Sequence, residues 1–201
     1  MGVKLISASG GSVEVVAPAT ASDFTATMPA GTGTVAVQGA STNIVSDTAQ
    51  TAPPTTPQYF DFTGIPSWVK KVTVLWNGVS TNGTSNPIIQ LGDSGGIEAT
   101  GYLGAASNMA TGVATLNFTT GFGVFGTSGW TAARVVYGGL IISKIDGNTW
   151  VASGTWAASD DNQIGVTSGA KALSDTLTQV RITTLGGTNT FDAGTINILY
   201  E

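Results

Sequence analysis

Short segments in which apolar and polar residues alternate constrain the fold of this chain more than any other feature. Val72, Val74 and Trp76 alternate with Lys71, Thr73 and Leu75. The same period of two returns at residues 114–118, where Ala114, Leu116 and Phe118 share one face, and at residues 196–200. This period places successive side chains on opposite faces of a β-strand. No stretch shows a sustained helical period with caps, so the sequence predicts an all-β fold.

Further strands are predicted at residues 135–142, 150–156 and 177–184. The first of these is almost wholly apolar, which predicts a strand buried on both faces, and its Gly138-Gly139 pair favours a close approach or a bulge. The turn signals between strands are Asn77-Gly78, Asn82-Gly83, Asp146-Gly147-Asn148 and Gly186-Gly187-Thr188-Asn189. Many short strands at this spacing predict an antiparallel β-sandwich that is jelly-roll-like.

The chain divides into three parts on composition. Residues 1–38 are predicted to form an N-terminal β-meander or hairpin that serves as an anchor or oligomerisation segment, residues 39–57 a Pro/Thr/Ser-rich linker, and residues 58–201 the β-sandwich domain. The meander contacts are expected from alternating residues on three short strands, namely Val13, Val15, Phe24, Met28, Val35 and Val37. So small a sheet is marginal alone in water and is expected to dock on another copy or another protein.

Composition excludes several classes of function. Only 9% of residues are charged and the net charge is −5, so the chain lacks the basic stripe that nucleic-acid binding requires. No apolar run approaches the ~20 residues of a membrane span, and the first residues lack the apolar stretch of a secretory signal. Histidine and cysteine are both absent, which removes the usual transition-metal ligands. No metal or cofactor site is therefore predicted.

The low content of charged residues also predicts contacts with other chains. Charge normally keeps protein surfaces hydrated and apart, so a chain this poor in charge is expected to have its surface covered by neighbours. Together with the marginal meander, this predicts a homo-oligomer, expected to be a trimer.

The segment Gly92-Asp93-Ser94-Gly95-Gly96 matches the residues around the nucleophilic serine of chymotrypsin-type proteases. That chemistry requires an imidazole base to accept the serine proton. The chain has no histidine, and no lysine lies near Ser94 in sequence. We therefore interpret the segment as a tight turn, since Asp, Ser and Gly favour turn conformations.

Two groups of acids are further candidates for chemistry. Asp93 and Glu98 are the one carboxylate pair near a glycine-rich segment, as sugar hydrolysis would need, but we favour a turn residue and a surface charge. Asp160 and Asp161, within Ser159-Asp160-Asp161-Asn162-Gln163, offer oxygens to a cation such as Ca²⁺. The spacing does not follow a calcium-binding loop, so we favour a polar turn. No catalytic residue is assigned.

Aromatic residues give the one candidate binding surface. Trp130, Trp150, Trp156 and Tyr102 are of the type that stacks on sugar rings in a receptor pocket. Aromatic residues in strands more often belong to the core, and that alternative stays open.

Two stretches resemble tailed-bacteriophage fibre and virion proteins. Residues 11–37 (GSVEVVAPATASDFTATMPAGTGTVAV) resemble a short module of those proteins, with Met28 in place of the usual leucine. Residues 62–102 (FTGIPSWVKKVTVLWNGVSTNGTSNPIIQLGDSGGIEATGY) look like a globular domain also met in phage structural proteins. The resemblance covers about a third of the chain, implies a virion part assembled in the bacterial host cytoplasm, and names no active residue.

Three functions remain at this level. The first is a non-enzymatic, fibre-like tail component, anchored through its N-terminal segment to other virion proteins and exposing the sandwich, which contacts a host surface glycan or protein. The second is a capsid-surface protein, either a head fibre or a decoration protein. The third is a polysaccharide-degrading enzyme or lectin-like binder, which the absence of a β-helix repeat and of a convincing carboxylate pair disfavours.

Overall fold

The computed structural model describes residues 3–6, 12–15, 44–52, 58–126, 130–132 and 134–201. The chain forms two compact units, Met1–Val37 and Gln38–Glu201. The described residues contain strands and turns and no helix, so the predicted all-β class is confirmed.

The N-terminal unit contains an antiparallel hairpin. Strand β1 (Val3–Ile6) pairs with β2 (Ser12–Val15), so that Val13 lies opposite Leu5 and Val15 opposite Val3. The strand predicted at Val13 and Val15 is confirmed, whereas its partner β1 was missed. The predicted strands that contain Phe24, Met28, Val35 and Val37 lie outside the described residues.

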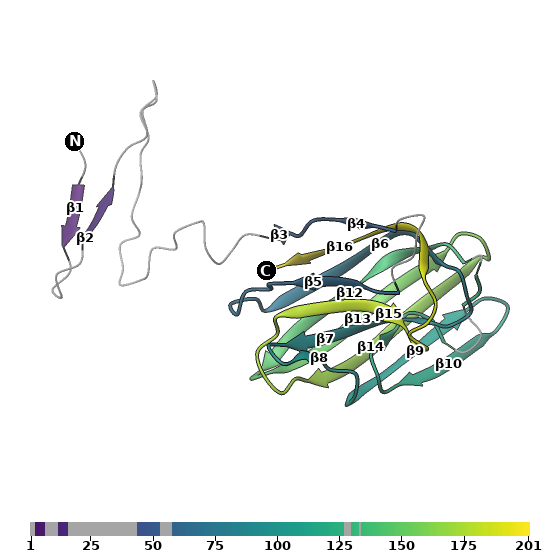
Figure 1. The fold of residues 1–201 in the computed structure, drawn as a ribbon. Coiled ribbons are helices and arrows are strands. Elements are labelled where there is room, and N and C mark those ends of the chain that lie inside the picture. The colour runs from purple at the N-terminus through teal and green to yellow at the C-terminus, as the bar shows by residue number, and fades with distance from the viewer. Residues whose placement is uncertain (1–2, 7–11, 16–43, 53–57, 127–129, 133) are drawn as a thin grey trace, which may run out of the picture. The chain divides into compact units, whose positions relative to one another are not determined.

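The second unit is a sandwich of two antiparallel sheets (Figure 1). The larger sheet has nine strands in the order β10-β9-β14-β13-β12-β6-β16-β3, and β4 also pairs with β16. Its strands are β3 (Val45–Ser46), β4 (Gln50–Thr51), β6 (Lys71–Thr81), β9 (Tyr102–Met109), β10 (Val113–Phe118), β12 (Val136–Asp146), β13 (Thr149–Ala158), β14 (Gln163–Ala172) and β16 (Phe191–Tyr200).

The smaller sheet has five strands in the order β11-β7-β15-β5, with β8 also paired to β7. Its strands are β5 (Phe60–Thr63), β7 (Pro87–Asp93), β8 (Gly96–Ile97), β11 (Phe122–Gly123) and β15 (Gln179–Thr184). The strands predicted around residues 71–76, 114–118, 150–156, 177–184 and 196–200 are all present.

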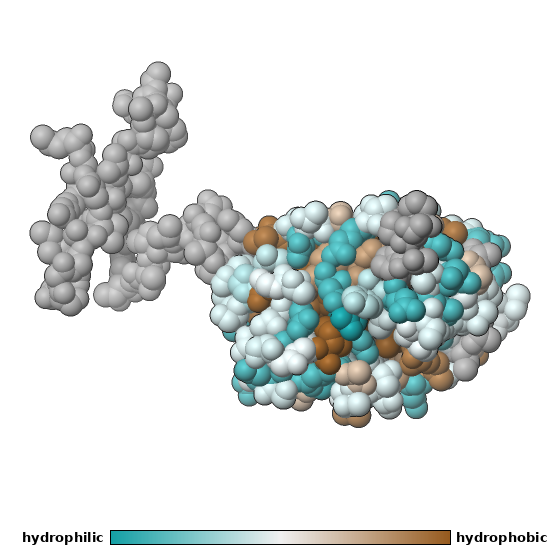
Figure 2. Space-filling view, in the orientation of Figure 1, coloured by the Kyte–Doolittle hydropathy of each residue, from teal (hydrophilic) through white to brown (hydrophobic). Residues whose placement is uncertain are grey.

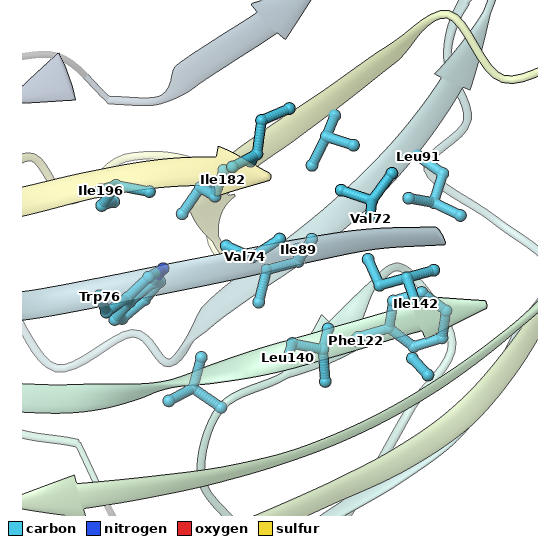
Figure 3. Packing of buried hydrophobic residues seen from close by; sticks show 14 of the residues in the cluster. Val72, Val74, Trp76, Ile89, Leu91, Phe122, Leu140, Ile142, Ile182 and Ile196 are labelled. Atoms are coloured by element: carbon cyan, nitrogen blue, oxygen red, sulfur yellow. The ribbon is translucent and has the colours of Figure 1, made fainter. Parts of the chain in front are cut away.

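The core lies between the two sheets (Figure 3). Val72, Val74 and Trp76 project from β6 toward Ile89 and Leu91 of β7, and all five are buried. Fully burying an aliphatic or aromatic side chain stabilises a fold by about 1.5–3 kcal/mol. Successive residues of β6 thus point alternately into the core and to the other side of the sheet, as the sequence pattern predicted.

Part of the predicted linker belongs to the sandwich. Strands β3 and β4 both pair with β16, and the backbone N–H groups of Asp47 and Ala52 donate to the carbonyls of Ile198 and Gly194 at 3.0 and 2.9 Å. The linker prediction is therefore wrong for residues 44–52, while residues 53–57 lie outside the described residues. The edge of β16 supplies partners for a segment whose own composition does not indicate a strand.

Strand β12 differs from its prediction. Only Val136, Leu140 and Ile142 are buried, whereas Tyr137 and Ile141 are exposed on the other side of the sheet. The strand is therefore half-buried, and its apolar outward residues concealed the alternation in the sequence. The predicted bulge is present: the register with β6 shifts between Val136 and Gly138.

One predicted turn is wrong. Asn77-Gly78 lies inside β6, where Gly78 has a φ of +67° and the register shifts against both β12 and β16. A bulge and a hairpin turn both use a glycine with positive φ, so the local signal is the same. The remaining turn signals do mark turns: residues 82–83 and 186–189 lie between strands, and Gly147-Asn148 follows Asp146, the last residue of β12.

Candidate functional site

The Gly92–Gly96 segment is a hairpin turn, as the sequence predicted. Strand β7 ends at Asp93, Ser94 and Gly95 form the turn, and Asp93 pairs with Gly96 at the start of β8. The Gly95 N–H donates to Asp93 Oδ1 at 2.7 Å, and Ser94 is exposed. The aspartate therefore stabilises the backbone of its own turn, which is the ordinary role of Asp in a tight turn.

The sequence-predicted carboxylate pair does come together, around the hydroxyl of Ser174. Ser174 Oγ lies 2.8 Å from Asp93 Oδ2 and 2.7 Å from Glu98 Oε1, and the Ser174 N–H donates to the same Glu98 oxygen at 2.7 Å. Lys171 Nζ donates to Glu98 Oε2 and also to the carbonyl of Ala172. Sequence reasoning missed two members of this group, Ser174 and Lys171, the latter only 5% exposed.

The electrostatics of this cluster oppose acid catalysis. Burial raises the pKa of Glu98, but the hydrogen bonds from Lys171 and Ser174 outweigh it and lower the pKa from 4.5 to about 2. A general acid needs a pKa raised toward the working pH so that it still carries a proton. Glu98 is ionised at neutral pH, and the cluster ties the β7–β8 hairpin to the end of β14.

The four aromatic residues predicted to contact sugars are core residues. Tyr102, Trp130, Trp150 and Trp156 are each 3% exposed or less, so the surface-stacking prediction is wrong. Three of them form hydrogen bonds inside the protein: Trp130 Nε1 donates to Thr81 Oγ1 at 2.7 Å, Trp156 Nε1 donates to Thr167 Oγ1 at 3.1 Å, and Tyr102 OH accepts the Leu91 N–H at 2.6 Å. Burial raises the pKa of Tyr102. Tyr102, Trp150 and Trp156 occupy inward positions of their strands, as aromatic residues in a sandwich usually do, whereas Trp130 lies outside the strands.

Asp160 and Asp161 lie in the polar turn between β13 and β14. Asp160 Oδ1 accepts the Val135 N–H at 2.9 Å, and Asp161 Oδ2 accepts bonds from Arg134 Nη2 at 2.8 Å and Gln163 Nε2 at 2.7 Å. The guanidinium of Arg134 thus supplies the positive charge that a bound cation would supply. No cluster of three or more potential ligands for a metal ion occurs within the described ranges.

An ion pair that the sequence did not indicate lies on the smaller sheet. Arg181 of β15 donates from Nε and Nη2 to the two carboxylate oxygens of Asp61 on β5, each at 2.7 Å, and these bonds raise the pKa of Arg181. The ring of Tyr59 lies 4.0 Å from the guanidinium carbon. An open hollow of about 430 Å³ borders this group and includes Gln90 and Thr183. Figure 2 shows one side of the molecule, where apolar residues occur in separate patches among hydrophilic ones.

The side of the larger sheet that faces away from the core forms a different kind of surface. Strand register aligns its outward residues in rows that cross the strands. One row is Val113, Met109, Ile164, Ala157 and Tyr137. The next is Thr115, Ser107, Val166, Thr155, Gly139 and Leu75. The third is Asn117, Ala105, Ser168, Ser153, Ile141 and Thr73. We call these three rows the outer face.

The outer face contains no Asp, Glu, Lys or Arg. Its larger apolar side chains are well exposed: Val113 is 72% exposed and Ile164 is 55% exposed. Leu103, in the adjoining row, is 77% exposed and borders an open hollow of about 530 Å³ that includes Ala105, Asn117 and Ser168. Lys71, which forms an ion pair with Glu201, lies at the far end of that same row. The outer face is therefore broad, uncharged and built mainly from small side chains.

The comparisons with known proteins add no family. No protein-family model matches the chain, and no curated protein or solved structure matches it. Among the described residues, no helix is long and apolar enough to cross a membrane.

Proposed function

We propose that this chain is a non-enzymatic structural protein of a bacteriophage virion, as a fibre-like tail component whose N-terminal unit attaches it and whose sandwich is exposed. The observation that carries the proposal is the division into a small N-terminal unit and a large unit with its own core. A unit with its own core folds independently, while a small hairpin gains stability by docking. The resemblance of residues 11–37 and 62–102 to phage structural proteins supports the same assignment.

The polar groups of the sandwich support a structural role. The carboxylates that could act in hydrolysis are held by Lys171 and Ser174, and Ser94 lies in an exposed turn of a chain without histidine. The lectin-like alternative depended on tryptophan rings that are buried. The strongest alternative is a capsid-surface protein, a head fibre or decoration protein, because the same two-unit plan serves either attachment site.

Deletion of residues 1–38 tests the proposal. The truncated protein is expected to keep β-type circular dichroism and a cooperative melt, yet to be missing from virions purified after complementation of a phage that lacks the full-length protein. The full-length protein is the control and should be incorporated. Incorporation of the truncated protein at the full-length copy number would show that the sandwich carries the attachment. Immunogold labelling of intact virions distinguishes tail from capsid.

A further inference from the structure

We infer that the outer face binds the outer face of a second copy of this chain. The inference goes beyond the proposed function and does not depend on it, because it rests on the sandwich alone. The N-terminal segment is expected to hold several copies together. The contact inferred here is a different one: it joins two sandwich units, whatever the number of copies that the N-terminal segment joins.

Charge favours a second copy as the partner. Each chain has a net charge of −5, so two copies repel wherever their acidic surfaces meet. The outer face carries no charged side chain, and a contact of this face with itself creates no like-charge pair. A basic partner, by contrast, would find no carboxylate there to bind. A face that meets itself forms an isologous contact, which closes around a twofold axis.

The size of the face fits a stable contact. The outer face crosses six strands from β10 to β6, about 4.8 Å apart, in three rows about 6.6 Å apart, and so spans on the order of 570 Å². Two such faces bury about 1,100 Å² in total, which is just above the about 1,000 Å² that a specific interface needs. Most of the outer face must therefore take part, which requires two sheets to approach over their whole width.

The side chains permit that approach. Stacked sheets pack about 10 Å apart when their facing side chains interdigitate. The central rows are dominated by Ala, Ser, Thr and Gly, which keep the face low, while Val166 and Ile141 supply apolar area within it. The first row contains only apolar residues and tyrosine, and exposed apolar patches usually mark interaction sites.

Thr155 marks the centre of the contact. It lies in the middle row of the outer face, on one of the two middle strands between β10 and β6, and its neighbours in the row are Val166 and Gly139. A residue at the centre of an isologous contact meets the same residue of the other copy. The chain contains no cysteine, so a single cysteine reports its own position without interference.

The test is cross-linking of the full-length protein with a short bismaleimide. The Thr155→Cys variant is expected to give a covalent dimer, whereas Thr188→Cys, in the exposed turn between β15 and β16, should give at least tenfold less. Equal cross-linking at the two positions would overturn the inference. No cross-linking at either position would also overturn it, and is the result expected if the N-terminal unit or another protein covers the face.

A charge variant provides an independent measurement. Thr155→Glu places two like charges together and is expected to weaken association at least tenfold in sedimentation velocity, while Thr188→Glu leaves it unchanged. Mixing Thr155→Glu with Thr155→Lys should restore association. A folded Thr155→Glu protein that associates as tightly as the wild type would overturn the inference. Loss of this contact does not change the meaning of the incorporation assay, because that assay tests attachment through residues 1–38.

Discussion

Lys171 and Glu98 show how a single pair of residues can decide the meaning of a motif. An ammonium group that is almost wholly buried requires a partner, because transfer of an unpaired charge from water costs several kcal/mol. Glu98 supplies that partner, and Ser174 completes the hydrogen bonding of the carboxylate. The segment that matches a protease motif thus has a structural role: its Asp93 binds the hydroxyl of Ser174, and Ser174 also binds Glu98 of the ion pair.

Glu98→Gln should lower the free energy of unfolding by about 2–3 kcal/mol at pH 7, because it leaves Lys171 buried without a counter-charge. The folded-state pKa of Glu98 lies below its ordinary value, so its contribution is fully present above pH 4.5 and is lost as the pH falls toward 2. Urea unfolding at several pH values should therefore show the two proteins converging in acid. Asp192→Asn, at an exposed carboxylate, is the control and should change stability by less than about 0.5 kcal/mol. A constant difference from pH 7 to pH 3 would contradict this account of the cluster.

At the scale of elements, the long strands of the larger sheet depend on glycines at their irregular positions. Gly138 lies in the bulge of β12 with a φ of +140°, and a Cβ there would lie 2.3 Å from the carbonyl oxygen of Thr155. Gly147, in the turn after β12, also has a positive φ of +51° but has open space around its Cβ position. The two positions share the backbone requirement and differ in the available space.

Gly138→Ala should therefore destabilise the protein by about 3–5 kcal/mol, the sum of backbone strain and steric overlap. Gly147→Ala should cost only about 1 kcal/mol, because strain acts alone. Chemical unfolding of both variants measures the difference. Equal costs would mean that the bulge of β12 can shift to accommodate a side chain.

For the whole molecule, strands β3 and β4 determine where the sandwich begins. They cover the edge of β16, and Gln50 Nε2 donates to the carbonyl of Asp61 at 2.8 Å, which connects this segment to the smaller sheet as well. A sandwich that starts at residue 58 lacks these bonds and leaves the edge of β16 unpaired. Open edges are also sites of aggregation.

Deletion of residues 1–57 should consequently be more damaging than deletion of residues 1–38. Both truncated proteins are expected to melt cooperatively, but the shorter one should be less stable by about 2 kcal/mol, the net worth of a few hydrogen bonds after the entropy of ordering the segment. Thermal unfolding followed by circular dichroism compares them. Equal stability would indicate that residues 44–52 contribute nothing to the sandwich.

The sequence by itself determined the all-β class and most strand positions. Alternation is a local property with a period of two, so residues 71–76 or 114–118 specify a strand without reference to the rest of the chain. Because these signals are local, they also led to the wrong predictions for Asn77-Gly78 and for β12. A bulge at Asn77-Gly78 and a turn have the same glycine signal, and an outward Ile141 conceals the alternation of β12.

Only the tertiary structure decided which side chains meet. Glu98 and Lys171, like Asp61 and Arg181, are far apart in the chain, and their contact depends on a strand register that no local pattern encodes. The outer face has the same origin: each strand contributes only a few uncharged outward residues, and pairing across strands from residue 73 to residue 168 joins them into one surface. Long-range pairing, which sets register and burial together, is the physical reason that this surface cannot be read from the sequence.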